Sequence, residues 1–309
     1  MKAADRCSHV SRRLDEPMDA TASRVRRWLL VEQPGSWGAD ALFESRLDPA
    51  VALELAARAH EVRARVVLVR RGLETPAGAP PGRRWFVART EPGGLGVVGG
   101  GVTADADLLG VDLVAAFEEV SRSAAADHDP VFLVCTNGRH DACCAEFGRP
   151  VYRRLAEERP DEAVFESSHI GGDRFAANVV CLPSGVYYGR VDPDRAVGMI
   201  DEHRRGTIDL ASYRGRCFHT PPEQAAEIDL RRREAIPGLD DVTVVASAAL
   251  DGRRHRWAVT LDARAEGGEA VTWRAEVERS PADTARILTC HGDAQTPPVY
   301  RVRDWSRIG

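Results

Sequence analysis

Hydrophobic residues in the first part of the chain fall into short apolar runs, typical of buried strands, and into stretches with helical spacing. Glycine- and proline-containing turns separate these segments, for example at Pro34-Gly35. The pattern predicts the order β-α-β-β-β-α, with strands at 27–33, 66–72, 84–90 and 95–101 and helices at 48–63 and 105–120.

The same order of elements recurs further along the chain. We predict strands at 131–135 and 163–169, a hairpin at 178–191, and helices at 145–158 and 193–205. A shift of 103 residues places Leu30 on Leu133 and Gly35 on Gly138. These repeats predict two tandem units of thioredoxin-like topology. The same shift sets Glu32 against Cys135 and Ala41 against Cys144, so only the second unit has thiols there, and the first is expected to be a structural or docking partner.

A different pattern begins near residue 214. A charged helix at 221–235 is followed by alternating runs, which predict a small antiparallel meander with one half-buried face, at 242–249, 254–263, 270–279 and 285–291. The sequence therefore predicts an α/β (α+β) protein with an N-terminal unit over 1–124, a second unit over 125–213 and a β-rich region over 214–309.

Charge and composition limit the classes of function. The chain has 309 residues, of which 43% are hydrophobic, and 42 Lys and Arg against 47 Asp and Glu give a net charge of −5. This balance argues against nonspecific nucleic-acid binding, which needs a basic surface. No window approaches the roughly 20 uncharged apolar residues of a membrane helix, and the first residues lack the apolar core of a secretory signal. We expect a soluble, cytoplasmic protein that binds neither nucleic acid nor membrane.

Candidate chemistry gathers where two predicted strands end. Cys135 and Cys144 lie nine residues apart, and His169 and Asp173 follow another strand, separated by two glycines that favour a flexible loop. A helix N-terminus lowers the pKa of a thiol and so helps it to bind a metal. Four donors on two loops at one end of a sheet suit a metal ion or a small cluster.

The cysteine segment, followed by the residues SHIGGDRFA, resembles the sucrase/ferredoxin-like family. WLLVEQPGSWGADAL at 28–42 and the late LTCHGD and TPPVY segments are also similar, so the resemblance spans nearly the whole chain. It implies a thioredoxin-like ferredoxin domain that holds a [2Fe–2S] cluster through two cysteines and two histidines. Carried over to this sequence, it implies Cys135, Cys144 and His169 as ligands, with Asp173 at the second histidine position.

The aspartate leaves the fourth ligand open. Asp173 can bind iron through oxygen, which we expect to lower the reduction potential relative to a bis-histidine cluster. Cys143 or Cys181 can replace it, or Asp173 can pair with Arg174 or cap a turn, with the cluster lost or replaced.

The remaining cysteines and His140 are given structural roles. Cysteine is often buried as a small apolar residue, so we expect Cys143, Cys181, Cys217 and Cys290 in the core. Cys7 is expected in a mobile tail, and His140 is expected to be a solvated loop residue.

The leading functional hypothesis is a [2Fe–2S] electron carrier that exchanges electrons with a redox partner protein, rather than a catalyst with a substrate pocket. A thiol redox enzyme using Cys135 or Cys144 is an alternative, weakened because the chain lacks the Cys-x-x-Cys spacing. A zinc protein with two cysteines, one histidine and one aspartate is another. No segment of paired carboxylates supports glycoside hydrolysis.

Overall fold

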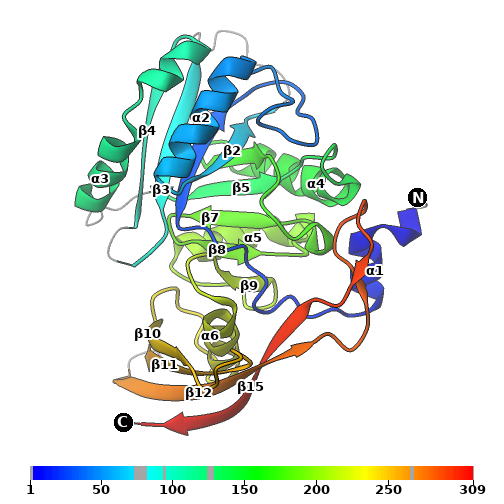
Figure 1. The fold of residues 1–309 in the computed structure, drawn as a ribbon, viewed down its shortest axis with the longest axis vertical. Helices are drawn as coiled ribbons and strands as arrows, with labels where there is room; N and C mark the ends of the chain where they lie inside the picture. The colour runs from blue at the N-terminus through cyan, green and yellow to red at the C-terminus, as the bar shows by residue number, and fades with distance from the viewer. Residues whose placement is uncertain (1–2, 73–81, 93–94, 124–128, 265–267, 309) are drawn as a thin grey trace.

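The chain forms one large sheet covered by helices and a smaller sheet beside it (Figure 1). The computed structural model describes residues 3–72, 82–92, 95–123, 129–264 and 268–308. Helix α6 (Pro221–Arg233) lies between the two sheets, in contact with β9 of the large one and with the strands of the small one.

The large sheet has nine strands. In spatial order these are β4 (Gly96–Val102), β3 (Arg83–Arg89), β1 (Arg27–Glu32), β2 (Arg65–Arg70), β6 (Ala163–Ser167), β5 (Val131–Cys135), β7 (Val179–Leu182), β8 (Val186–Tyr188) and β9 (Tyr213–Arg216).

The two halves of this sheet share one strand order. The central strand, β1 or β5, runs parallel to β2 or β6 and antiparallel to β3 or β7. Strands β2 and β6 pair antiparallel, Val69 opposite Ser167 and Arg70 opposite Glu166, and so join the halves. The expected fold class, two tandem thioredoxin-like units followed by a small antiparallel region, is confirmed. The boundaries at residues 124 and 213 stay a prediction.

Helices cover the outer face of each half. They are α2 (Pro49–Glu61) and α3 (Leu113–Ser123) on the first half, and α4 (Ala142–Glu158) and α5 (Pro193–Arg204) on the second. Two predicted helices differ from those observed. The stretch 105–120 is divided into a 3-10 turn, Asp105–Gly110, and α3. Helix α4 begins before residue 145, because the side chain of Asp141 caps it by accepting from the backbone N–H of Cys143.

The sheet curls so that the inner faces of its two halves share a core. The ring centroids of Trp28 on β1 and Tyr187 on β8 lie 6.4 Å apart, although several strands separate them in the sheet order. Phe86 on β3 and Phe165 on β6 are 5.7 Å apart in the same way. Cys135 belongs to this buried cluster, so the strand that carries the site is fixed by packing from both halves.

The small sheet corrects one predicted strand. Its order is β10 (Val242–Ala249), β11 (Arg256–Arg264), β12 (Ala270–Pro281) and β15 (Pro298–Arg307). The run 285–291 is not its fourth strand, because the chain leaves the sheet after β12 and returns only with β15. This excursion contains only the short strands β13 (Arg286–Ile287) and β14 (Ala294–Gln295), and Figure 1 shows it reaching up beside α1.

The N-terminal segment is ordered against the second unit. Helix α1 (Cys7–Arg13) contacts β13 and the 3-10 turn η3 (Asp173–Phe175), and Ser8 donates to the Asp173 carbonyl at 2.7 Å. Cys7 is fully buried, so the expectation that it lies in a mobile tail is wrong.

Candidate metal centre

Cys135 and Cys144 are brought together by a close approach of α4 to β5. Cys135 is the last residue of β5, and Cys144 lies in the first turn of α4. Gly148, one turn further along the helix, makes this approach possible, because a Cβ there would lie 2.0 Å from the Cys135 carbonyl oxygen. Both sulfurs are therefore buried, with exposed fractions of 1% and 0% for the two residues.

A glycine turn brings His169 and Asp173 to the same place. Gly171 and Gly172 have φ values of 104° and 87°, a left-handed conformation that favours glycine. The turn was expected to be flexible, but its backbone is tied down. The buried Arg214 side chain donates to the Gly171 carbonyl at 3.2 Å, and the Tyr187 hydroxyl donates to the Ile170 carbonyl at 3.1 Å.

The four residues predicted as ligands converge. The sulfurs of Cys135 and Cys144 and a ring nitrogen of His169 all lie within 4.8 Å of one another. Asp173 Oδ1 is 3.3 Å from Cys144 Sγ and 2.9 Å from His169 Nδ1. The contact with Nδ1 lacks the alignment of a hydrogen bond, so this buried nitrogen has no hydrogen-bond partner. Two thiols, an imidazole and a carboxylate gathered at one buried place form a donor set that fits a metal or an iron–sulfur group.

His140 joins this group, which the sequence did not predict. Its ring stacks on that of His169 with centroids 3.7 Å apart, and its Nε2 lies 3.7 Å from Asp173 Oδ2. The first unit helps to hold it, because His140 Nδ1 is 3.2 Å from the carbonyl oxygen of Ala39. Its position inside the cysteine loop was the only sequence signal for this role.

The ionisable groups of the site change one another's pKa values. Burial alone lowers the pKa of His169, but the Asp173 carboxylate and the Cys135 sulfur raise it more, to about 9. The Cys144 thiol, by donating to the Cys135 sulfur, lowers the pKa of Cys135, and the same interaction together with burial raises the pKa of Cys144. These opposite shifts favour the thiolate form at Cys135 over that at Cys144.

The imidazoles separate the sulfurs from solvent. His140 and His169 line a surface depression of about 790 Å³, with side chains 33% and 26% exposed. Asp173 also lines it, and so does the excursion between β12 and β15, through residues at 288–292. The two sulfurs are therefore buried, whereas the two imidazoles are partly exposed in the depression.

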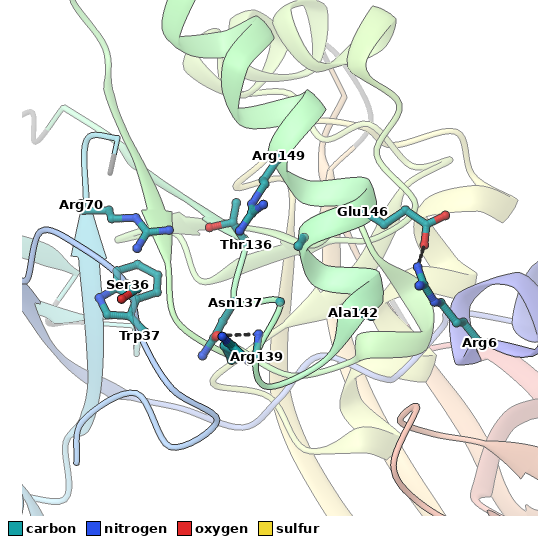
Figure 2. A pocket seen from close by; sticks show the side chains of 12 residues that line it. Arg6, Ser36, Trp37, Arg70, Thr136, Asn137, Arg139, Ala142, Glu146 and Arg149 are labelled. Carbon is teal, nitrogen blue, oxygen red and sulfur yellow. Dashed lines mark hydrogen bonds and ion pairs between the residues drawn. The ribbon is translucent and has the colours of Figure 1, made fainter. Parts of the chain in front are cut away.

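A second depression of about 580 Å³ lies along the same loop (Figure 2). It is lined by Thr136, Asn137 and the first turns of α4, and by the Trp37 and Arg70 side chains of the first unit. None of the four predicted ligands lines it.

The other cysteines divide into two groups. Cys181 and Cys217 are core residues, as expected, and burial raises the pKa of both thiols. Cys143 is fully buried in a core cluster with Cys7 and Ala176, as expected, and Cys290 is only partly buried against this cluster. The sulfurs of Cys7, Cys143 and Cys290 also lie against one another, which the sequence did not predict. Arg174 pairs with Glu16 at 2.9 Å, which removes it as the partner of Asp173.

Comparisons with known proteins place these observations in context. Residues 18–215 match the family described as sucrase/ferredoxin-like. The protein named altered inheritance of mitochondria protein 32 is 33% identical over 96 residues in Debaryomyces hansenii, covering 28% of this chain and 35% of that protein. The protein of that name from Clavispora lusitaniae is 32% identical over 99 residues, covering 29% and 36%. The match thus spans about a third of the length of these relatives.

Among solved structures, the wild-type thioredoxin-like [2Fe–2S] ferredoxin from Aquifex aeolicus is 20% identical, with a TM-score of 0.25. That match covers 27% of this chain and 94% of the ferredoxin. In the described residues, no helix combines the length and the apolar character needed to cross a membrane.

Proposed function

The chain belongs to the sucrase/ferredoxin-like family, and on this premise we propose that it is a one-electron carrier with a [2Fe–2S] cluster in its second unit. Cys135, Cys144 and His169 are three of the proposed ligands and Asp173 is the fourth. The observation that carries the proposal is the convergence of two buried sulfurs and a ring nitrogen of His169, all within 4.8 Å of one another, with the Asp173 carboxylate beside them.

The donor set favours two kinds of ligand on two irons. Two thiolates on one iron and two harder donors on the other is the arrangement of histidine-ligated [2Fe–2S] centres. Cys135 and Cys144 supply the sulfur side, and His169 with Asp173 supplies the other side. Asp173 is only 4% exposed, which suits a ligand better than a solvated carboxylate.

A specific observation makes His140 the second candidate for the fourth position. His140, His169 and Asp173 also form a group whose ligand atoms lie within 4.8 Å of one another. His140 restores the two-histidine ligation implied by the family, with the second imidazole coming from the cysteine loop.

The arrangement of the chain's own residues suits electron transfer better than catalysis by a thiol. When bound, the cluster supplies a centre that gains and loses one electron without breaking bonds. The protein buries the sulfurs and exposes the imidazole edges in the depression, where a partner protein can approach. A thiol redox enzyme is disfavoured, because a substrate sulfur cannot reach the buried Cys135 or Cys144. A cytoplasmic location remains a prediction.

The test is to purify the chain anaerobically and to measure its visible spectrum, iron, acid-labile sulfide and zinc. We expect equal iron and sulfide, about two of each per chain, as a [2Fe–2S] centre requires. Zinc without iron, removed by Cys135→Ser, would favour the zinc protein instead. A metal-free chain in which Cys135 and Cys144 react readily would favour the thiol enzyme.

Two variants then identify the fourth ligand. Asp173→Asn is expected to lose the cluster or shift its potential if Asp173 binds iron, whereas His140→Ala is expected to leave both unchanged. The opposite result would assign the position to His140.

A further inference from the structure

A second cluster of ligand-type side chains lies next to the proposed iron–sulfur site, on residues that are far apart in the sequence. It consists of Cys7 at the start of α1, Asp141 and Cys143 at the start of α4, and Cys290 in the excursion between β12 and β15. Their ligand atoms all lie within 4.8 Å of one another. Cys143 and Cys144 are consecutive on α4, and one faces each cluster.

The three sulfurs form a nearly equilateral triangle. Cys7 Sγ lies 3.7 Å from Cys143 Sγ and 3.6 Å from Cys290 Sγ, and Cys143 Sγ lies 3.6 Å from Cys290 Sγ. Tetrahedral zinc with zinc–sulfur bonds of about 2.3 Å requires sulfurs about 3.8 Å apart. The observed separations match this arrangement and greatly exceed a disulfide bond of about 2.0 Å. Three cysteines also cannot all pair as disulfides.

Asp141 completes the tetrahedron. Its Oδ2 lies 3.6 Å from Cys7 Sγ, close to the roughly 3.5 Å expected between a sulfur and a carboxylate oxygen on one zinc ion. The backbone N–H groups of Cys143 and Cys290 fix its orientation by donating to Oδ1 at 2.9 Å and Oδ2 at 2.6 Å. Ligand carboxylates in metal sites are commonly oriented by such outer hydrogen bonds.

Charge balance at this buried position favours a cation. Asp141 is 0% exposed, and the groups that contact it are backbone amides, the Thr289 hydroxyl and thiols, with no cationic side chain among the described residues. These hydrogen bonds stabilise the charged carboxylate, but no positive charge among the described contacts offsets it. A divalent cation would balance both the carboxylate and the thiolates.

We propose that Cys7, Cys143, Cys290 and Asp141 form a structural zinc site. An iron–sulfur cluster fits less well, because all four donor atoms lie within 4.8 Å of one another, whereas a cluster divides its ligands between two or more irons. Thiolate-rich tetrahedral sites are typical of zinc.

A metal here would hold α1 and the excursion between β12 and β15 to the start of α4. Figure 1 shows the excursion leaving the small sheet and ending beside α1, and apart from this cluster its regular structure is limited to the two-residue strands β13 and β14. A metal bound across residues 7, 143 and 290 would supply binding free energy that this packing lacks. It would also fix the wall, at 288–292, of the depression over His169.

The test measures zinc per chain in the full-length protein after dialysis against metal-free buffer. We expect about one zinc in the wild type, and at least a tenfold weaker hold on zinc against a chelator in Cys290→Ser. Cys217→Ser is the matched control, because Cys217 is a buried thiol outside both clusters that already donates to the Thr90 hydroxyl. It should keep its zinc.

A second experiment uses only the wild-type protein, so its result does not depend on whether the variants fold. Iodoacetamide labelling, mapped by mass spectrometry, should modify the partly exposed Cys290 only after chelation. The proposal is overturned by absence of zinc with Cys290 freely labelled, by a disulfide among the three cysteines, or by zinc that Cys135→Ser removes and Cys290→Ser does not. Only the last of these outcomes also counts against the proposed iron–sulfur function.

Discussion

The two halves of the large sheet have the same strands but carry different side chains where the central strand ends. At the end of β1, Glu32 forms an ion pair with Arg84 at 2.8 Å. At the end of β5, Cys135 faces Cys144 and His169. One backbone framework thus supports a surface ion pair in one half and a candidate metal centre in the other.

The helices that follow these strands explain the difference. Asp48 and Asp141 are the N-caps of α2 and α4, so Val51 in the first half occupies the place of Cys144, and Leu55 that of Gly148. Ala41, set against Cys144 by the shift of 103 residues, is not its counterpart, because a longer connection precedes α2. Helix α2 packs on β2, whereas α4 packs on β5, where glycine at position 148 allows an approach close enough for two thiols to meet.

The largest effect is expected when the last residue of the central strand is substituted, separately in each half. Cys135→Ser is expected to abolish the visible spectrum and nearly all bound iron, because serine is a poor ligand for iron–sulfur centres. Glu32→Gln is the matched control and should keep both. Equal iron in the two purified variants, measured with sulfide, would remove Cys135 from the ligand set.

Among the ion pairs described above, the one between β2 and β6, which joins the halves, is expected to contribute most to the unfolding free energy. Arg70 and Glu166 lie opposite each other on β2 and β6, 2.6 Å apart, and are 3% and 5% exposed. Glu166→Ala leaves a buried guanidinium unpaired, so we expect a loss of about 3–5 kcal/mol in unfolding free energy, measured by urea denaturation. Glu158→Ala, which breaks an exposed pair with Arg154, should cost less than about 0.5 kcal/mol. Similar losses in both would contradict this interpretation.

A buried histidine should make the second half sensitive to acid. His203 on α5 lies between the hydroxyls of Ser184 and Tyr188, and burial, with the charge of Arg216, lowers its pKa to about 4. The unfolded chain, with a histidine pKa of about 6.5, therefore takes up the proton first as pH falls. Stability should fall by about 3 kcal/mol between pH of about 6.5 and 4, from the roughly 1.4 kcal/mol that each pKa unit represents.

His203→Gln is the variant for this measurement. It should lose most of that pH dependence in urea titrations, while it can still hydrogen-bond both hydroxyls. An unchanged slope between pH of about 6.5 and 4 would assign the acid sensitivity to other groups.

The smallest effect is expected from a substitution where α4 lies close to β5. Gly148→Ala places a methyl group against the Cys135 carbonyl, so we expect a cost of about 1–3 kcal/mol and weaker retention of iron. Gly198→Ala on α5 is the control, because nothing lies within 4 Å of a Cβ there, and it should stabilise by up to about 1 kcal/mol. If Gly148→Ala is neutral in urea denaturation, helix approach does not explain the difference between the halves.

Local patterns in the sequence were enough to predict most strands and the topology of each half. Apolar runs specify buried strands directly, as at Val131–Cys135. The candidate ligands were predicted from their spacing and the family resemblance, and the structure brings all four together. His140 was missed because its role depends on stacking against His169, which no local pattern encodes.

Long-range features could not be predicted. The curl that brings Trp28 to Tyr187 depends on packing across several strands. The cluster of Cys7, Cys143 and Cys290 joins positions up to 283 residues apart, and nothing beside Cys7 or Cys290 distinguishes them from core or tail cysteines. Such sites depend on tertiary structure that periodicity does not specify.

The position of α1 has a practical consequence for anyone who handles this protein. The first ordered helix rests against the turn that carries Asp173, whereas the last strand ends at the far side of the small sheet (Figure 1). An affinity tag or fluorescent fusion attached in front of residue 1 would crowd the histidine-lined surface and compete with any docking protein. The same fusion placed after residue 309 would leave that surface accessible.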